Sequence, residues 1–338
     1  MIIVMKADAT KADADELLTL IESKGLKPLY LPGEERTVLG ALGDERILAE
    51  MHLHNHPHVD EVKAILSPYK KVSRELHPED TIVNVGSCRF APDKFVVIAG
   101  PCAVESEAQM QSVAQGISQS GAKLLRGGIF KPRTSPYSFQ GLGLDGLGIF
   151  AESAHQHGMG TVTEVTDTTE VEQLEGQVEM FQIGSRNMQN FRLLEAVGKT
   201  NTPVLLKRGL SAKIDELLLA AEYIFDNGNE QVVLCERGIR TYETATRNTL
   251  DLNAVAYIKQ RSHLPIIVDP SHGTGVKELI VPMSKAAVAA GADGIIVEVH
   301  PNPSEALSDA HQQLTVSEFD ELVRQIKPFI TASGRSFS

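Results

Sequence analysis

In the longer, C-terminal part of the chain, hydrophobic residues fall into short, nearly continuous runs separated by amphipathic segments. The eight runs lie at residues 95–102, 123–128, 160–165, 180–185, 203–209, 231–238, 264–272 and 294–300. Strands that are apolar at nearly every position are buried on both faces, as in parallel sheets covered by helices. Eight strand–helix units over roughly 250 residues predict a TIM barrel. A doubly wound open sheet is the alternative, but it does not require eight similar units.

The N-terminal part has a different pattern, which predicts the order strand, helix, strand, strand, helix, strand. The strands are expected at 2–5, 28–31, 36–43 and 59–66, and the helices at 13–25 and 44–54. Leu17, Leu18 and Ile21 have helical spacing, and their segment ends at Gly25. The sequence PGEE between the second and third strands is typical of a hairpin turn. This order predicts a ferredoxin-like α+β domain. We place that domain at residues 1–70, a polar linker at 71–93 and the barrel at 94–338.

Composition excludes several classes of protein. The 338 residues are 42% hydrophobic and carry a formal net charge of −12, which argues against a general nucleic-acid-binding role. No apolar run is long enough to span a membrane, and the first residues read as a strand and a helix, not as a signal peptide. Three cysteines are too few and odd in number for a disulfide framework, so we expect a cytoplasmic protein.

Reactive or charged residues mark the ends of the predicted strands. In chain order they are Cys102, Arg126, Glu164, Arg186, Lys207, Arg237, His272 and Glu298. Catalytic groups of a TIM barrel lie at these C-terminal ends. Some polar residues are expected wherever a strand ends, but four cations beside apolar runs in an acidic protein need a counter-charge. Few carboxylates stand at these ends, so an anionic ligand is the simplest partner.

The segment KPRTSPYSFQG (131–141) follows the second run and adds Lys131, Arg133 and Thr134 to the same rim. With Arg126, Arg186, Lys207 and Arg237, the rim then has six cations. Guanidinium groups match phosphate and carboxylate geometry, and prolines reduce the entropy that such a loop loses on binding. Because one phosphate rarely uses more than two or three cations, six indicate two phosphates, or two phosphates and a carboxylate.

A second set of strand-end residues could hold a metal. Cys102, His272 and Glu298, with Asp309 downstream, combine a thiol, an imidazole and two carboxylates. Mixed S/N/O sites suit Mn²⁺, Fe²⁺, Co²⁺ or Zn²⁺. The spacing is not a contiguous metal motif, and a residue such as Cys102, taken alone, is more often a small buried hydrophobe. From the residues alone both interpretations stay open.

Two further polar segments carry weaker signals. We interpret His52, His54, His56 and His58 as histidines on a solvated surface of the small domain, although such tracts also bind metals. The loop GIRTYETATRNTLD (238–251) either holds substrate or uses Thr246 or Asn248 to cap the next helix.

Seven motifs together resemble those of 3-deoxy-D-arabino-heptulosonate 7-phosphate synthases of type I-beta with an N-terminal ferredoxin-like domain. They are AGPCAVES, KPRTSPYSFQG, IGSRNMQNF, LLKRG, CERGIRT, VDPSHGTG and GIIVEVHPNPSEALSD. The resemblance covers nearly the whole chain and is strongest from residue 94. That family condenses phosphoenolpyruvate with erythrose 4-phosphate, the first step of the shikimate pathway, and uses a divalent metal, with Mn²⁺ the expected ion. Its substrates carry two phosphates and one carboxylate.

The resemblance also implies roles for individual residues. Cys102, His272, Glu298 and Asp309 would be metal ligands, and Lys131 and Glu164 would manage water and protons at the reacting carbon. Phosphoenolpyruvate would bind Arg126, Lys131, Ser185, Arg186, Lys207 and Arg237, and the phosphate of erythrose 4-phosphate would bind Arg133 and Thr134. Members with the extra domain are often homotetramers inhibited by an aromatic amino acid, so we expect an oligomer and a regulatory role for the small domain.

Three alternatives differ in what they require. A 3-deoxy-manno-octulosonate 8-phosphate synthase would have KANRS where this chain has KPRTS. A Schiff-base aldolase would use Lys207 as its nucleophile and would remain active in EDTA. A non-enzymatic sensor of a small anion or amino acid would leave the polar barrel mouth unexplained.

Overall fold

The computed structural model of the protein describes residues 1–33, 36–63, 67–132 and 135–338. These residues form two compact units, Met1–Glu79 and Asp80–Ser338, which we describe one at a time. The division falls inside the stretch 71–93 that the sequence assigns to a linker. Among the described residues, no helix is both long and apolar enough to cross a membrane.

The first unit is a ferredoxin-like domain, as predicted. Its elements are β1 (Ile2–Met5), α1 (Lys11–Ser23), β2 (Lys27–Pro32), β3 (Thr37–Leu42), α2 (Glu45–Glu50), the 3-10 helix η1 (Leu53–Asn55) and β4 (Val59–Lys63). The strands form an antiparallel sheet in the order β2-β3-β1-β4. Helix α1 starts with a capping box in which Thr10 and Asp13 bond to each other's backbone N–H groups. Its Leu17 and Ile21 are fully buried, which confirms the helical periodicity.

The second unit contains the predicted barrel. Its parallel strands are β7 (Lys94–Gly100), β8 (Leu124–Arg126), β9 (Gly160–Val165), β10 (Met180–Ile183), β11 (Val204–Lys207), β12 (Val232–Glu236), β13 (Ile266–Val268) and β14 (Gly294–Glu298). Each strand pairs with the next, and β14 pairs in parallel with β7, which closes the barrel. All eight predicted runs therefore contain a strand, and the open-sheet alternative is wrong.

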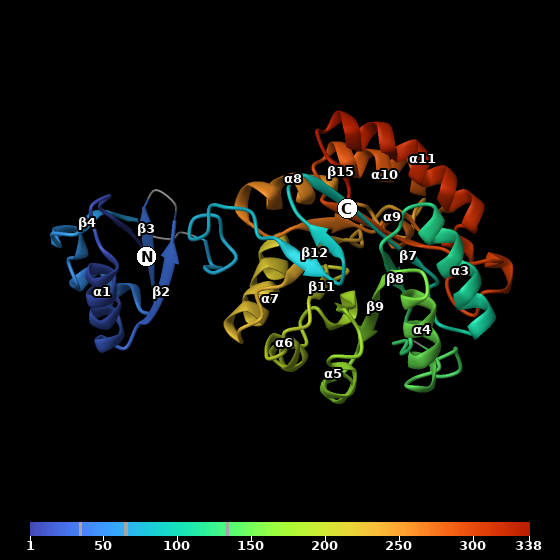
Figure 1. Ribbon diagram of the computed structural model, residues 1–338, viewed down its shortest axis with the longest axis horizontal. Coiled ribbons are helices and arrows are strands. Elements are labelled where there is room, and N and C mark those ends of the chain that lie inside the picture. Colours follow the sequence, from blue (N-terminus) through green and yellow to red (C-terminus); the bar gives the residue numbers. More distant parts are fainter. Residues whose placement is uncertain (34–35, 64–66, 133–134) are drawn as a thin grey trace. The chain divides into compact units, whose positions relative to one another are not determined.

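Helices surround the barrel in the described part of this unit (Figure 1). They are α3 (Glu107–Gln119), α4 (Asp145–His155), α5 (Thr168–Leu174), α6 (Phe191–Gly198), α7 (Ile214–Asp226), α8 (Leu252–Arg261), α9 (Pro270–Thr274), α10 (Ile280–Ala289) and α11 (Val316–Ala332). Short 3-10 helices η2 (Ser185–Asn187), η3 (Lys277–Leu279), η4 (Pro303–Glu305) and η5 (Ala310–Gln312) lie in the connections. At least one α-helix follows every strand, so the loops at the carboxyl ends of the strands gather at one end of the barrel.

A hairpin of β5 (Val83–Val85) and β6 (Cys88–Phe90) packs at the other end of the barrel. Its buried residues belong to one hydrophobic cluster with side chains from every barrel strand. The N–H of Asn84 donates to the side chain of Gln231, just before β12. The hairpin therefore belongs to the barrel unit, although the sequence assigns its residues to a linker. The last strand, β15 (Ser336–Phe337), pairs with the start of β7.

Candidate active site

A cavity of about 420 Å³ opens at the carboxyl ends of the barrel strands. Its lining includes nine residues singled out from the sequence, namely Arg126, Lys131, Glu164, Ser185, Arg186, Lys207, Arg237, His272 and Asp309. Arg240 and Arg247 add two more cations to the same wall. The structure therefore brings residues separated by more than half the chain into a single cationic cavity, at the end of the barrel where the sequence places it.

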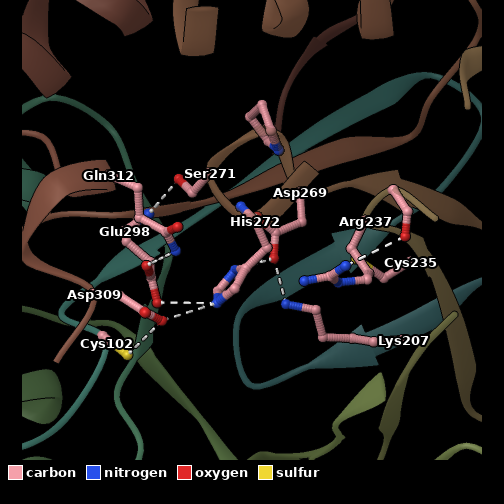
Figure 2. A network of polar contacts seen from close by, with 12 residues as sticks. Cys102, Lys207, Cys235, Arg237, Asp269, Ser271, His272, Glu298, Asp309 and Gln312 are labelled. Carbon is pink, nitrogen blue, oxygen red and sulfur yellow. Dashed lines mark hydrogen bonds and ion pairs between the residues drawn. The ribbon is translucent and has the colours of Figure 1, made fainter. Parts of the chain in front are cut away.

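The predicted metal ligands form one cluster. The sulfur of Cys102 and carboxylate oxygens of Glu298 and Asp309 lie within 4.8 Å of one another. His272 Nε2 lies 3.5 Å from Glu298 Oε1 and 3.6 Å from Asp309 Oδ2. In Figure 2 the four side chains point toward a common centre. Among the described residues, this is the place where at least three such donors converge.

Each donor is held by the end of a barrel strand or by the loop that follows it. Glu298 is the last residue of β14, and Cys102 follows β7, the strand with which β14 pairs. His272 lies on the short helix α9 after β13. Asp309, in the connection to α11, has φ +46°, a left-handed conformation that a non-glycine residue keeps only where its surroundings hold it.

The electrostatics of the cluster suit a cation. Burial, reinforced by the charge of Glu298, raises the pKa of the Cys102 thiol to about 11. Burial also acts to raise the pKa of Asp309 and of Glu298, but the interactions with His272, together with those of Arg247 at Asp309 and Arg126 at Glu298, outweigh it and both pKa values are lowered. The carboxylates are therefore charged at neutral pH, whereas the thiol must lose its proton to become a ligand. A thiolate, an imidazole and two carboxylates fit a borderline divalent metal such as Mn²⁺, Fe²⁺, Co²⁺ or Zn²⁺.

Arg126 connects this cluster to the anion-binding side of the cavity. One terminal nitrogen donates to Glu298 Oε1 at 2.7 Å. Its Nε is buried and has no hydrogen-bond partner among the described residues. A buried donor without a partner is uncommon in folded proteins. Lys131 lies close by and donates to the backbone oxygen of Cys102 at 3.0 Å.

A carboxylate that the sequence argument did not count balances another of the cations. Asp269, 1% exposed, accepts from the ammonium group of Lys207 and from His272 Nδ1, the latter at 2.7 Å. Burial acts to raise the pKa of Asp269, but His272 and Lys207 outweigh it and hold this pKa well below its usual value. The expectation that strand ends offer few carboxylates is therefore only partly right, because Arg126 and Lys207 both have buried partners.

Glu164 occupies a position that only a glycine neighbour permits. It lies on β9, and its Oε2 accepts from Gln182 on β10 at 3.3 Å. A Cβ added to Gly184 would lie 2.0 Å from Glu164 Oε1, which is an impossible contact. The glycine after β10 therefore lets the carboxylate face the cavity.

The sequence did not reveal every residue of the site. Arg240 and Arg247 line the cavity from the polar loop 238–251, for which both a substrate role and a capping role stayed open. Asp251 is the residue that caps α8, through the N–H of Ala254. Asn248 lines the cavity and donates to the backbone oxygen of His272, so neither Asn248 nor Thr246 acts as the cap. The two cations of the loop 238–251 were the sequence feature that could have indicated its place in the cavity lining.

The segment that follows β8 is described only in part. Pro132, Ser135 and Ser138 line the cavity. Arg133 and Thr134, the residues expected to bind the second phosphate, lie outside the described residues.

Comparisons with known proteins agree with this geometry. A model of the DAHP synthetase I family matches residues 86–331, and a model of the DAHP synthase ferredoxin-like domain matches residues 1–67. The chain belongs to the DAHP synthetase I family. The family match contains every cavity and donor residue named above.

Similar proteins include one that extends over both units. A phospho-2-dehydro-3-deoxyheptonate aldolase from Thermotoga maritima is 49% identical over 334 residues, 99% of each chain. A 2-dehydro-3-deoxyphosphooctonate aldolase from Nitrobacter hamburgensis is 30% identical over 269 residues, which cover 73% of this chain and 92% of that protein.

Two solved structures from Thermotoga maritima are also similar. The crystal structure of a phospho-2-dehydro-3-deoxyheptonate aldolase (DAHP synthase) superposes with a TM-score of 0.80 at 48% identity, covering 100% of this chain and 99% of that one. A truncated form of 3-deoxy-D-arabino-heptulosonate 7-phosphate synthase gives 0.74 at 48% identity and covers 79% of this chain and 98% of its own.

Proposed function

We propose that the protein condenses phosphoenolpyruvate with erythrose 4-phosphate to form 3-deoxy-D-arabino-heptulosonate 7-phosphate and phosphate, the first step of the shikimate pathway. The observation that carries this proposal is the cationic cavity beside the Cys102–His272–Glu298–Asp309 donor cluster, in a chain that is 49% identical to a phospho-2-dehydro-3-deoxyheptonate aldolase over both of its units. The substrates together carry two phosphates and a carboxylate, which matches the excess of cations in the lining.

The cations divide between the two substrates. Phosphoenolpyruvate binds Ser185 and five cations of the cavity lining, namely Arg126, Lys131, Arg186, Lys207 and Arg237. The unpartnered Nε of Arg126 is a donor suited to one of its oxygens. Arg133 and Thr134, with the same loop's Ser135, bind the phosphate of erythrose 4-phosphate. The condensation requires that the enol carbon of the first substrate bind near the aldehyde of the second.

Cys102, His272, Glu298 and Asp309 would hold a divalent metal, Mn²⁺ or otherwise Fe²⁺, Co²⁺ or Zn²⁺. Such an ion would supply Lewis-acid chemistry at the aldehyde oxygen. Asp269 fixes the ring of His272 through Nδ1, so that Nε2 faces the donor cluster.

The remaining steps need proton and water management at the reacting carbon. The enol carbon attacks the aldehyde, the cationic carbon that results takes up water, and phosphate leaves with cleavage of its C–O bond. Glu164 accepts the proton of that water, and Lys131 supplies a proton or a positive charge at the developing anion. Both side chains line the cavity.

The test is a direct assay. The purified protein is mixed with both substrates, and phosphate release is measured with and without EDTA. We expect release with both substrates, loss of turnover in EDTA and recovery with Mn²⁺. Full turnover after exhaustive chelation would contradict metal dependence, and it would favour a Schiff-base aldolase. The contact between Lys207 and the buried Asp269 argues against that alternative, because the nitrogen that would attack a carbonyl is already engaged by this carboxylate.

The 2-dehydro-3-deoxyphosphooctonate aldolases among the relatives make the aldose the main competing question. The sequence KPRTS favours erythrose 4-phosphate over arabinose 5-phosphate. We expect Arg133→Ala to raise the KM for erythrose 4-phosphate more than that for phosphoenolpyruvate. The lost charge-assisted contact should cost about 1.5–3 kcal/mol. An equal rise in both KM values would mean that Arg133 does not discriminate between the substrates.

Three further properties belong to the same proposal. The protein acts in the cytoplasm as a homo-oligomer, by resemblance a tetramer, and an aromatic amino acid inhibits it through the ferredoxin-like domain. The proposal of an effector is supported by the ferredoxin-like domain, which forms a unit of its own and contributes no described residue to the cavity. In that domain His52 and His54 are exposed, and His58 Nε2 lies 3.4 Å from Asp13 Oδ1, which fits the solvated surface expected for this segment.

A further inference from the structure

Two consecutive glutamines lie directly behind the donor cluster. Gln312 and Gln313, at the end of the connection that carries Asp309, are both 0% exposed. A buried primary amide is costly unless its donor and acceptor groups are satisfied. Here each amide uses both its oxygen and its nitrogen, and the partners belong to residues of the donor cluster or to their immediate neighbours.

Gln313 joins the two loops that hold Cys102 and Asp309. Its Oε1 accepts from the N–H of Cys102 at 3.2 Å, and its Nε2 donates to the backbone oxygen of Ser308 at 2.8 Å. Ser308 immediately precedes Asp309, whose left-handed backbone needs such support. One side chain therefore sets the separation of two donors that are 207 residues apart in the sequence.

Gln312 holds the third donor. Its Nε2 donates to Glu298 Oε2 at 2.6 Å, and its Oε1 accepts from Arg247 at 2.9 Å. Figure 2 shows this amide beside the Glu298 carboxylate. The chemistry of the partners fixes the orientation of both amides, because arginine and backbone N–H groups only donate, whereas carboxylates and carbonyls only accept.

We propose that Gln312 and Gln313 are positioning residues that pre-arrange Cys102, Glu298 and Asp309 for the metal. They touch neither substrate nor metal. They act by holding one carboxylate in a single rotamer and two loops at a fixed separation, so that little rearrangement is needed when the ion binds. This inference rests on the metal centre proposed above and adds the residues that support it.

The test compares metal binding by the full-length wild type with that by Gln313→Met and Gln312→Met. Methionine keeps the length and volume of the side chain and removes both hydrogen bonds. Co²⁺ is titrated into chelator-treated protein, and the thiolate-to-cobalt absorption band is recorded. We expect each variant to bind Co²⁺ about 10–100-fold more weakly. For Gln313→Met we also expect a weaker absorption band and, at saturating metal, a lowered kcat with an unchanged KM for phosphoenolpyruvate.

Asn229→Leu is the matched control. Asn229 is a buried amide at the opposite end of the barrel, where its Nδ2 donates to the backbone oxygens of Val197 and Thr202 at 3.1 and 2.8 Å. Its loss should lower stability as much as the glutamine variants do while leaving Co²⁺ affinity at the wild-type value. This control separates support of the metal centre from a general loss of stability.

The outcomes are distinct. Wild-type Co²⁺ affinity in both glutamine variants, or a loss no larger than that in Asn229→Leu, overturns the positioning role alone. If Gln313→Met does not fold, Gln312→Met decides the question in the same assay. A wild-type protein that does not bind Co²⁺ overturns the proposed metal centre and this inference together.

Discussion

At the scale of single residues, the main distinction within the site is between cations that have a buried carboxylate partner and cations that do not. Arg126 and Lys207 are paired with the buried carboxylates of Glu298 and Asp269. Because removing one member leaves the other as an uncompensated buried charge, substitutions at these pairs combine catalytic and structural effects. The clearest tests at this scale are residues whose chemistry can be removed without leaving such a charge.

Cys102 is one such residue. We predict that Cys102→Ala folds but binds Mn²⁺ on the order of 100-fold more weakly, because it removes a ligand and only a small apolar volume. Titration calorimetry with Mn²⁺ measures the affinity. Cys88→Ala is the control, since Cys88 is a buried thiol in the hairpin at the other end of the barrel. Unchanged affinity in Cys102→Ala would remove the sulfur from the proposed ligand set.

Gly184 tests the placement of Glu164. A methyl group there would displace the Glu164 carboxylate, so we predict that Gly184→Ala lowers kcat by roughly 10–100-fold, the range that a displacement of about 1 Å can cause. Gly148→Ala on α4 is the control, because an added Cβ meets nothing within 4 Å. If the two variants turn over at equal rates, Glu164 does not need its observed position.

At the scale of elements, the long apolar runs could be predicted and the shortest strands could not. Strands β7–β14 are buried on both faces, so hydrophobicity alone marks them. Strands β5 and β6 have three residues each and alternate buried and exposed positions, a pattern too short to distinguish from a linker. Asp269 was overlooked for a different reason. In the sequence it looks like an ordinary residue that caps a helix, as it does for α9, and its contact with Lys207 becomes visible only in the fold, where the ends of β11 and β13 lie close together.

At the N-terminal end of the barrel, Glu179 links strand β9 and helix α4, and we expect this contact to depend on pH. Glu179, just before β10, accepts from the N–H of Thr161 on β9 at 2.8 Å and lies 2.9 Å from His155 Nε2 on α4. Burial acts to raise the pKa of Glu179, but the hydrogen bonds from Thr161 and His155 outweigh it, so this pKa is lowered. A lowered folded-state pKa gives stability that is present above the unfolded-state pKa and is lost as pH falls through the folded-state value.

We therefore predict that Glu179→Gln is less stable than the wild type by about 1–2 kcal/mol at pH 7, and that the difference shrinks below about pH 4. Denaturant unfolding at pH 7 and pH 3 measures both values. Glu175→Gln, at an exposed position, is the control and should show little difference at either pH. A gap that stays constant between the two pH values would contradict the assignment.

At the scale of the whole molecule, the division of the chain after Glu79 separates the proposed chemistry from the proposed regulation. All cavity and donor residues belong to the second unit. The fold class and nearly all of the candidate site could be predicted, because catalytic side chains of a TIM barrel must follow its strands. The boundary between the units could be placed within 71–93 but not at a single residue, because the polar composition of this stretch resembles a linker whether or not part of it folds onto the barrel.

We predict that deletion of residues 1–79 leaves a barrel that keeps its turnover and loses any inhibition by tyrosine or phenylalanine. Phosphate release with and without the amino acids measures both properties. Deletion of residues 1–85 is the comparison: it removes β5 and thus the hairpin that packs against the barrel, so it should also lower the unfolding temperature. A folded 80–338 fragment without activity would make the first domain part of the catalytic machinery.

The donor cluster lies across the closure of the barrel, since β14, which ends at Glu298, pairs with the first barrel strand, β7, and Cys102 follows that strand. Closing the barrel therefore brings Glu298 and Cys102 to the same place in the fold. A chain still emerging from the ribosome has Cys102 early, but it lacks Asp309 until 207 more residues have been made. A chain that has not yet reached Asp309 cannot assemble the full set of donors, so the proposed metal centre would be available only to chains that extend past that residue.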